Sequence, residues 1–384
     1  MKVKLALPKG QLQAGTAGLL ERAALEFDQY HEGSGSYRPN CAERPGLFVK
    51  VLHEKDIAIQ VAIGNYDLGI CRLDWVEELL TKYHGDAVTR IREFGYGMRG
   101  VYAATACEAG CGSLEALRQR SGSLRIVTEY PNLAESFALE RRLKHFQIFP
   151  VWGATGAYLP EHAELAVVAA RSPERLLEQG LSPVATLLES SACLVANRNS
   201  LARKDLRRVL EALCSVDPQG LGLEDVNGNG VEPAANARDY GQGAVSLALP
   251  DGHQQRHMLQ FLKKAGIGID GYELDSTISR PRIALDGIAV KVIRPQDMPQ
   301  QVANGNFDMA VTGRDWLRDH RLRFPSSPVE EMLELGFGRV RIVAVVNGDM
   351  PVSRTGDLRR SEREAALRVA SEYVNIADRY ALEN

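Results

Sequence analysis

The sequence predicts an α/β fold in which one unit occurs twice, the second time only in part. Apolar runs alternate with helical segments over residues 3–197, and strands that alternate with helices are typical of α/β folds with parallel or mixed sheets. In addition, the motif "GNYDLGICRLDW" at 64–75 returns as "GNFDMAVTGRDW" at 305–316, with five positions identical. A twelve-residue motif repeated in this way indicates duplication.

Three more pairs of motifs recur in the same order, at an offset of 241–243 residues. They are "LALPKG" at 5–10 with "LALPDG" at 247–252, "FGYG" at 94–97 with "LGFG" at 335–338, and "RIVTEYPNLAESFALE" at 125–140 with "RVASEYVNIADRYALE" at 368–383. Nearly constant spacing indicates one duplicated unit of about 240 residues rather than a solenoid of short repeats. The second copy begins near residue 243, so we expect it to be incomplete within these 384 residues.

Each element of the first copy follows from its apolar period and its end signals. Apolar or alternating runs predict strands, at 3–8, 47–53, 66–71, 99–105, 124–130, 163–170 and 191–197. Helical spacing predicts helices between and after them, at 11–27, 54–65, 74–83, 131–145, 172–180 and 201–213. Residues typical of helix ends support these boundaries, because Gly64 ends one predicted helix and Pro131 is the first residue of another.

Composition predicts a cytoplasmic protein. Hydrophobic residues make up 45% and charged residues 25% of the chain, and the net charge is −3. This balance gives no sign of a basic nucleic-acid face. No apolar run reaches the roughly 18–20 residues that cross a bilayer, and the N-terminus lacks the pattern of a signal peptide. We therefore expect neither nucleic acid nor a membrane among its partners.

Three short patterns resemble metal sites, and each lacks part of the ligand set. Cys107 and Cys111 are four apart, without the paired spacing of a zinc site. The stretch "DVNGNG" at 225–230 imitates a calcium loop but has Asn236 where the twelfth-position Glu belongs. His253 and His257 lie four apart, with no third ligand evident. We interpret all three as structural, with the calcium-like stretch a turn inside a linker.

The repeated motifs resemble one known family. "LALPKG", "FGYG", "RIVTEYPNL", "GATGAYLP" and "SSACLVAN" in the first copy, with "VIRPQDMP", "VTGRDWL" and "LGFG" in the second, occur in the order found in ATP phosphoribosyltransferase, the first enzyme of histidine biosynthesis. The resemblance implies a two-lobed unit with the fold of type II periplasmic binding proteins. It implies these boundaries: lobe one at 1–104 with a returning segment at 188–213, lobe two at 105–187, a linker at 214–243, a second lobe one at 244–345, and the start of a second lobe two at 346–384.

The resemblance also implies a reaction. N1 of the adenine of ATP would attack C1 of phosphoribosyl pyrophosphate and release pyrophosphate with the help of Mg²⁺, in a homo-oligomer. A ring nitrogen needs no strong base, so the chemistry lies in aligning two anions and neutralising the leaving group. Catalytic residues are not assigned, and the substrate-binding residues expected from the motifs are Lys9, Gly10, Arg171, Ser172, Arg175, Arg294, Asp297, Thr312, Gly313, Arg314 and Asp315.

Several positions depart from the family pattern. The Arg-Pro-x-Asp motif is intact at 294–297 but reads "HEKD" at 53–56, and the Thr-Gly turn at 312–313 becomes Cys71-Arg72. The family's GATE becomes GATG at Gly156, and Asp251 stands where the first copy has Lys9. In the pyrophosphate loop the expected Asp and hydroxyl-rich turn become Val168 and an Arg-Ser-Pro turn ending at Pro173, and proline has no N–H for a phosphate.

These departures keep two other functions open. The chain could be a non-catalytic descendant that binds a nucleotide or a partner, with the loop at 168–175 reduced to a helix cap. A transport-type anion-binding protein rests on fold analogy alone. The sequence predicts little or no transferase turnover for these 384 residues by themselves.

Overall fold

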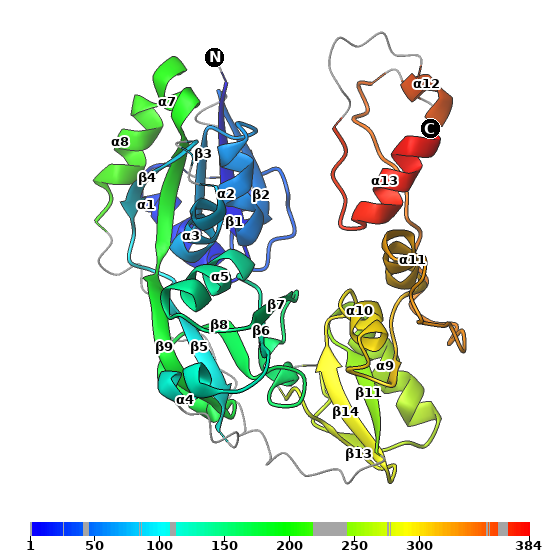
Figure 1. The fold of residues 1–384 in the computed structure, drawn as a ribbon. Coiled ribbons are helices and arrows are strands. Elements are labelled where there is room, and N and C mark those ends of the chain that lie inside the picture. Colours follow the sequence, from blue (N-terminus) through cyan, green and yellow to red (C-terminus); the bar gives the residue numbers. More distant parts are fainter. Residues whose placement is uncertain are drawn as a thin grey trace. The chain divides into compact units, whose positions relative to one another are not determined.

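The computed structural model describes residues 2–25, 27–40, 46–83, 85, 87–107, 113–217, 244–274, 276, 278–350, 352, 354–359 and 368–384. The chain divides into two compact units, one of residues 1–150 and 158–233 and the other of 151–157 and 234–384 (Figure 1). Cys111, the calcium-like stretch and most of the expected linker lie outside the described residues. Within the described ranges, no helix is long and apolar enough to span a membrane.

The first sheet of the first unit has the strand order β2-β1-β3-β10-β4. Its strands are β1 (Val3–Lys9), β2 (Leu47–His53), β3 (Leu68–Arg72), β4 (Val88–Glu93) and β10 (Ala192–Asn197). β10 runs antiparallel to its neighbours, whereas β1 pairs in parallel with β2 and β3. Apolar side chains on the two faces of this sheet build two separate cores, which is why helices cover both sides.

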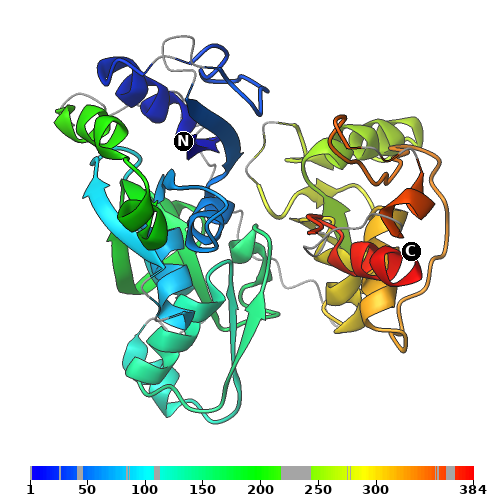
Figure 2. The ribbon, with the colours of Figure 1, turned by 90° about the horizontal axis from the view of Figure 1, so that it is seen from above.

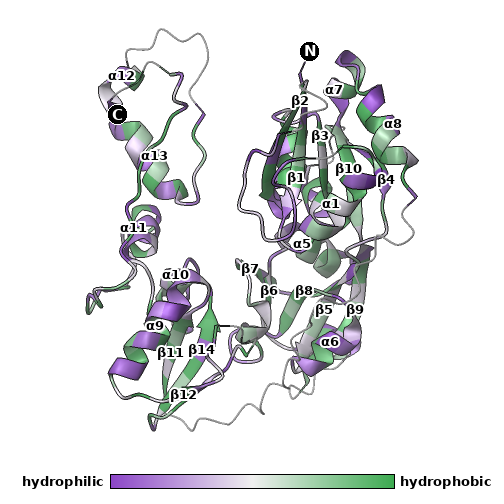
Figure 3. Cartoon of the chain, turned by 180° about the vertical axis from the view of Figure 1, so that it is seen from behind, coloured by the Kyte–Doolittle hydropathy of each residue, from purple (hydrophilic) through white to green (hydrophobic). Residues whose placement is uncertain are grey.

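Helices α1 (Gln13–Arg22) and α8 (Arg207–Ser215) pack on one face of this sheet, and α2 (Glu54–Ala62) and α3 (Leu73–Lys82) on the other (Figure 1, Figure 2). Figure 3 shows α8 with both hydrophobic and hydrophilic surface, as a helix covering a core requires. We expected one helix at 201–213, and this is wrong. The helix α7 (Arg198–Arg203) ends before Lys204, and Asp205 accepts the amide hydrogen of Arg207 (3.3 Å) where α8 begins.

The second sheet of the first unit has the order β7-β6-β8-β5-β9. Its elements are β5 (Arg99–Ala106), α4 (Leu114–Gln119), β6 (Leu124–Thr128), α5 (Pro131–Glu140), β7 (Phe146–Pro150), β8 (Leu165–Ala170), α6 (Pro173–Glu178) and β9 (Leu181–Ser190). A short 3-10 helix at Thr155–Tyr158 begins in the segment 151–157, which belongs to the second unit. The chain passes between the sheets twice, from β4 to β5 and from β9 to β10. Two sheets joined by two crossings form the two-lobed type II architecture that we predicted.

The second unit repeats the start of the first sheet, with the order β14-β11-β15. Its elements are β11 (Val245–Pro250), α9 (His253–Lys264), β12 (Ile269–Asp270), β13 (Arg282–Ile283), β14 (Ile288–Ile293), α10 (Met298–Ala303), β15 (Met309–Ala310), α11 (Arg314–Arg323), α12 (Thr355–Arg359) and α13 (Val374–Glu383). The register also repeats, because Leu5 pairs with Leu68 and Leu247 with Met309. The duplication therefore extends to strand register.

A long-range contact between two helices also occurs in both copies. In the first unit, the carboxylate of Glu78 on α3 accepts hydrogen bonds from the amides of Asn132 and Leu133, both at 2.9 Å, at the start of α5. In the second unit, Asp319 on α11 makes the same two contacts with the first amides of α13, at 3.0 and 2.9 Å. A helix start leaves amides unpaired, so each carboxylate caps the helix that follows it in space.

Three strands of the first sheet, β1, β2 and β3, have counterparts in the second unit, namely β11, β14 and β15. Residues 329–334 and 340–347, the counterparts of β4 and β5, form no strand. In the first unit β4 pairs with β10, and β5 pairs with β8 and β9. No equivalent pairing occurs among the described residues of the second unit.

Candidate functional site

The predicted site of the first unit lies at the carboxyl ends of β1, β2 and β3. Lys9 ends β1, and its ammonium lies 5.4 Å from the centre of the Tyr37 ring. Gly10 has a φ of +84°, a conformation that side chains rarely adopt, and it lets the chain turn into α1. In open α/β sheets, ligands bind at this edge. The structure thus places both predicted residues where a ligand site belongs.

Arg72, which the sequence marks only as a departure, fills the centre of this edge. It is 3% exposed. Its Nη1 donates to Glu54 (2.8 Å), its Nε to the carbonyl of Gly97 (3.0 Å) and its Nη2 to Gln11 (3.1 Å). All three nitrogens of the guanidinium are therefore engaged by three different segments of the chain.

A second buried arginine links the two lobes of the first unit. Arg99, at the start of β5, donates to the carboxylate of Asp74 (2.6 Å) and to the hydroxyl of Tyr130 (2.7 Å). Asp74 is fully buried, and Tyr130 also donates to it at 3.2 Å. Trp75 stacks on Tyr130, with ring centres 4.5 Å apart. Burial raises the pKa of the Tyr130 hydroxyl, and the adjacent Asp74 charge adds to this rise.

Glu54 connects these two arginines. Its Oε1 lies 2.8 Å from Arg72 and 3.9 Å from Arg99. Burial raises the pKa of the Glu54 carboxyl, although both arginines act to lower it. Its Oε2 is buried and has no hydrogen-bond partner among the described residues. Glu54 therefore joins Arg72 of lobe one to the cluster of Arg99, Asp74 and Tyr130, where the two lobes meet.

The predicted pyrophosphate loop lies at the start of α6 in lobe two. Arg175 pairs with Glu178 within that helix (2.9 Å). Ser172 occupies the N-cap position in an extended conformation, without a side-chain capping bond, and its hydrogen bond with Glu174 lowers the pKa of that exposed carboxyl. Arg171 precedes the cap, directly after β8. Val168 lies on β8 opposite Tyr102. The prediction that this loop binds a substrate remains untested.

In the second unit, the residues equivalent to Lys9 and His53 are Asp251 and Arg294, and they form an ion pair. Nη1 of Arg294 lies 3.1 Å from Oδ2 of Asp251. Burial raises the pKa of Asp251, and Arg294 acts against this rise. The remaining Oδ1 of Asp251 and Nε of Arg294 are buried with no hydrogen-bond partner among the described residues. This pair retains unsatisfied acceptor and donor capacity.

The other predicted residues of the second unit divide into two groups. Thr312 donates to the carbonyl of Pro295 (2.7 Å), so it lies against the loop of Arg294 and the buried Asp297. A side chain at Gly313 would require the Asp315 carboxylate to move, because an added Cβ would lie 1.9 Å from Oδ1 of Asp315.

Arg314 and Asp315 are engaged elsewhere. Arg314 is exposed and forms an ion pair with Glu331. Asp315 accepts a hydrogen bond from Tyr373 (2.6 Å). The structure therefore brings Arg294, Asp297 and Thr312 together, whereas Arg314 forms an ion pair with Glu331 at the surface.

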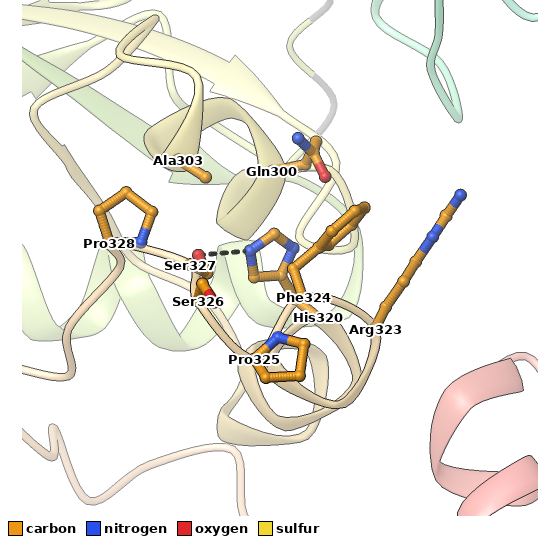
Figure 4. Close-up of a pocket in the computed structure, with 9 residues that line it drawn as sticks. All are labelled: Gln300, Ala303, His320, Arg323, Phe324, Pro325, Ser326, Ser327 and Pro328. Atoms are coloured by element: carbon orange, nitrogen blue, oxygen red, sulfur yellow. Dashed lines mark hydrogen bonds between the residues drawn. The ribbon is translucent and has the colours of Figure 1, made fainter.

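No predicted site residue lines the pocket drawn in Figure 4, whose volume is about 380 Å³. It lies between α10 and the end of α11, where Nε2 of His320 is 2.8 Å from Oγ of Ser327. Burial, aided by Arg321 and Arg323, lowers the pKa of His320. His257 packs on the ring of Phe337, at 6.0 Å between centres. Within the described ranges no group of three or more His, Cys, Asp or Glu residues could hold a metal ion.

The fold defines a two-lobed α/β protein, and sequence comparison identifies its family. The family model of ATP phosphoribosyltransferase matches residues 53–215 and 294–384. The chain belongs to the ATP phosphoribosyltransferase family, as the motifs predicted.

Two relatives and two solved structures illustrate the similarity. The ATP phosphoribosyltransferase of Prosthecochloris aestuarii is 31% identical over 202 residues, or 52% of this chain and 64% of the relative. That of Chlorobaculum parvum is 27% identical over 300 residues, or 72% of this chain and 97% of the relative. The chain thus spans somewhat less than two thirds of the first relative.

Among solved structures, the ATP phosphoribosyl transferase (HisG:HisZ) complex from Thermotoga maritima has 20% identity and a TM-score of 0.45, covering 55% of this chain and 96% of that one. The alkanesulfonate-binding protein SsuA from Xanthomonas axonopodis has 10% identity and a TM-score of 0.35, covering 55% of this chain and 71% of that one.

Proposed function

We propose that this protein transfers the phosphoribosyl group of phosphoribosyl pyrophosphate to N1 of the adenine of ATP and releases pyrophosphate. Membership of the family supports this proposal most directly. Both substrates are polyanions, and the loop edges carry cations, Lys9 in the first unit and Arg294 in the second. Such a site works by holding the two reactants in line and by stabilising the charge of the leaving group.

The Mg²⁺ that this reaction implies fits the second unit. Magnesium is usually bound by substrate phosphates and one or two carboxylates. Oδ1 of Asp251 is a buried carboxylate oxygen with no hydrogen-bond partner in the described part of the chain, so Asp251 would hold the ion beside a phosphate. When bound, the ion would neutralise charge on the pyrophosphate. Arg294 lies beside Asp251 and would contact the same anion.

We expect the protein to act in the cytoplasm, where ATP is made available for biosynthesis, and to form a homo-oligomer. These expectations follow from the family and from the charge balance rather than from a contact in the structure. The non-catalytic alternative is not favoured by family membership, and the transport alternative has no support beyond the general fold.

The test is a turnover assay with ATP, phosphoribosyl pyrophosphate and saturating Mg²⁺, followed by pyrophosphate release and by product absorbance. We expect measurable binding of both substrates but a rate well below about 1 per second, a usual rate for metabolic enzymes. Loss of one well-placed polar contact lowers rates by about 10²–10³-fold, and Val168, Pro173 and His53 depart from the family pattern. Failure to bind either substrate, or binding of both without any pyrophosphate release, would refute the proposed function, and a rate above about 1 per second would refute the low-turnover prediction.

Replacing Arg294 with alanine is expected to weaken nucleotide binding by about 1–3 kcal/mol, because a charge-assisted contact is lost. Calorimetric titration with ATP in the presence of Mg²⁺ measures the change. Arg379→Ala serves as the control, because Arg379 is exposed on α13, its charge is paired with Glu383, and it is not among the predicted site residues. Equal affinity of the Arg294 variant and the parent would reject Arg294 as a nucleotide contact.

A further inference from the structure

The pocket in Figure 4 holds an aromatic ring beside a cation. The guanidinium carbon of Arg323 lies 5.0 Å from the centre of the Phe324 ring, and the imidazole centre of His320 lies 5.2 Å from the same point. α10 contributes Gln300 and Ala303 to the same pocket. Its volume of about 380 Å³ falls within the usual range for small-molecule sites, about 300–1,000 Å³. The pocket thus suits a small molecule with an aromatic ring.

Two polar groups of this pocket have no partner among the described residues. The guanidinium of Arg323 forms no ion pair or hydrogen bond there, and it contacts only the Phe324 ring. His320 is 8% exposed, and its Nε2 lies 2.8 Å from Oγ of Ser327, but its Nδ1 forms no hydrogen bond within the described ranges. A polar atom of a buried side chain costs free energy unless water or a ligand pairs with it. The pocket therefore offers a cation and a ring nitrogen to a ligand.

The cation and the aromatic ring occur in both copies. The offset of 241 residues aligns Arg323 with Lys82 and Phe324 with Tyr83. The ammonium of Lys82 lies 5.7 Å from the centre of the Tyr83 ring, much as Arg323 lies over Phe324. This pair therefore belongs to the repeated fold, and by itself it does not distinguish the pocket of the second copy.

Two hydrogen-bonding side chains do distinguish it. The same offset aligns His320 with Leu79 and Gln300 with Ile59. Leu79 packs against the core on one face of the first sheet, whereas both counterparts in the second copy line the pocket. Nε2 of Gln300 donates to Asn304 (2.9 Å), and the side-chain oxygen of Gln300 has no partner in the described part of the chain. Polar side chains in an apolar crevice are unfavourable unless they are bonded, so the two exchanges indicate a ligand.

We propose that this pocket binds a small aromatic carboxylate that carries a hydroxyl group opposite its carboxylate. The carboxylate pairs with Arg323, the ring packs on Phe324, and the hydroxyl bonds to Nδ1 of His320. A guanidinium binds a carboxylate through charge-assisted hydrogen bonds, and aromatic rings stack on one another. Arg321 donates to the carbonyl of Val329 (2.8 Å), so Arg323 is left as the cation for the ligand, which favours one negative charge over the two of a phosphate.

A hydroxyl group can donate or accept, so it fits Nδ1 in either tautomer of His320. Burial, aided by Arg321 and Arg323, lowers the pKa of His320 and keeps its ring neutral at pH 7. No predicted substrate residue lines the pocket. The proposal therefore does not depend on the transfer reaction, and it adds a second kind of ligand to the second unit.

Calorimetric titration of the full chain with para-hydroxybenzoate tests the proposal. We expect one saturable site per chain. Para-hydroxybenzamide has the same shape without the charge and should bind more weakly by about tenfold or more, because the charge-assisted bond to Arg323 is lost. Saturating ATP should leave the titration unchanged, because the pocket shares no residue with the expected substrate positions.

Variants assign the site to this pocket. His320→Leu and Gln300→Ile introduce the residues of the first copy, and each should weaken binding of para-hydroxybenzoate by about tenfold. Arg323→Gln should abolish the preference for the acid over the amide. Arg318→Gln is the matched control, because Arg318 is exposed on the same helix and does not line the pocket, and this variant should bind like the parent.

Four results would overturn the proposal. Two of them need no variant to fold, namely absence of a saturable site in the parent and equal binding of the acid and the amide. The third is displacement of para-hydroxybenzoate by ATP, which would place it at a substrate position. The fourth is unchanged affinity in a His320→Leu chain with native circular dichroism. If that chain does not fold, unchanged affinity in the Gln300→Ile chain has the same meaning.

Discussion

Replacing Asp67 with alanine is expected to destabilise the first unit by about 3–5 kcal/mol, the usual effect of breaking a buried ion pair from one side. Asp67 is 1% exposed and lies at the start of β3. It accepts hydrogen bonds from the amide of Lys4 (2.8 Å), the hydroxyl of Ser200 (2.6 Å) and the ammonium of Lys204 (2.9 Å). Alanine would leave the buried Ser200 hydroxyl and the partly buried Lys4 amide and Lys204 ammonium without this acceptor at the junction of β1, β3 and α7.

Urea unfolding followed by Trp75 fluorescence measures this effect on the first unit. The matched control is Asp308→Ala in the second unit, because Asp308 occupies the equivalent position but is exposed and bonds only to Ser246 among the described residues. That substitution should change stability far less. Similar losses from the two substitutions would contradict the assignment of Asp67 as a buried charge centre.

The pKa of Asp67 predicts that the stability of the first unit depends on pH. Burial of Asp67 alone would raise its pKa, but the hydrogen bonds from Lys204, Ser200 and Lys4 lower it below the ordinary value. The folded protein therefore holds the proton less tightly than the unfolded chain, whose Asp pKa is about 3.9. This contribution to stability is fully present above that value and is lost as the pH falls through the lower, folded pKa. Asp67→Asn should reduce the loss of stability that occurs as the pH falls below about 3.9.

The sequence predicted the central strands and the edge strand β2, and missed three other edge strands, β4, β7 and β9. β3 has five buried residues, and its apolar run is plain in the sequence. β4 alternates Arg and Glu with apolar residues, and β9 contains Pro183, which has no amide hydrogen for a ladder. β9 lies at the edge of its sheet, where a proline is tolerated. Tertiary pairing rather than local pattern determines such strands.

The candidate site was predictable in its position but not in its chemistry. The repeated motifs located the loops after β1, β2 and β3, because those loops lie at fixed places in the duplicated unit. The motifs also marked "HEKD" and Arg72 as separate departures. That these departures join as the Arg72–Glu54 pair depends on a contact between residues 18 positions apart on adjacent loops. Spacing alone could not distinguish this from two unrelated losses.

Replacing Asp74 with alanine is expected to destabilise the first unit by about 3–5 kcal/mol and to loosen the contact between its two lobes. Arg99 and Tyr130 both donate hydrogen bonds to the carboxylate of Asp74. The backbone amide of Asp74 donates to the Ser190 hydroxyl (2.9 Å), and alanine would keep this bond. Without the carboxylate, the buried Arg99 guanidinium keeps only the distant Glu54 oxygen at 3.9 Å as a counter-charge. An unpaired buried cation is far more costly than a lost neutral hydrogen bond.

The second copy provides the control for this prediction. Asp315 is equivalent to Asp74 and accepts the hydroxyl of Tyr373 as Asp74 accepts that of Tyr130, and Trp316 packs on Tyr373 as Trp75 packs on Tyr130. The offset aligns Arg99 with Val340, so Asp315 has no arginine at that position. Asp315→Ala should therefore remove a hydrogen bond, at about 1–3 kcal/mol, without exposing a buried charge. Urea unfolding of the two variants, read at Trp75 and at Trp316 in single-tryptophan chains, should show the larger loss for Asp74.

A double-mutant cycle of Asp74→Ala with Arg99→Met separates the charge effect, because removing both partners should restore part of the stability. An additive cycle would show that Arg99 and Asp74 do not act as a pair.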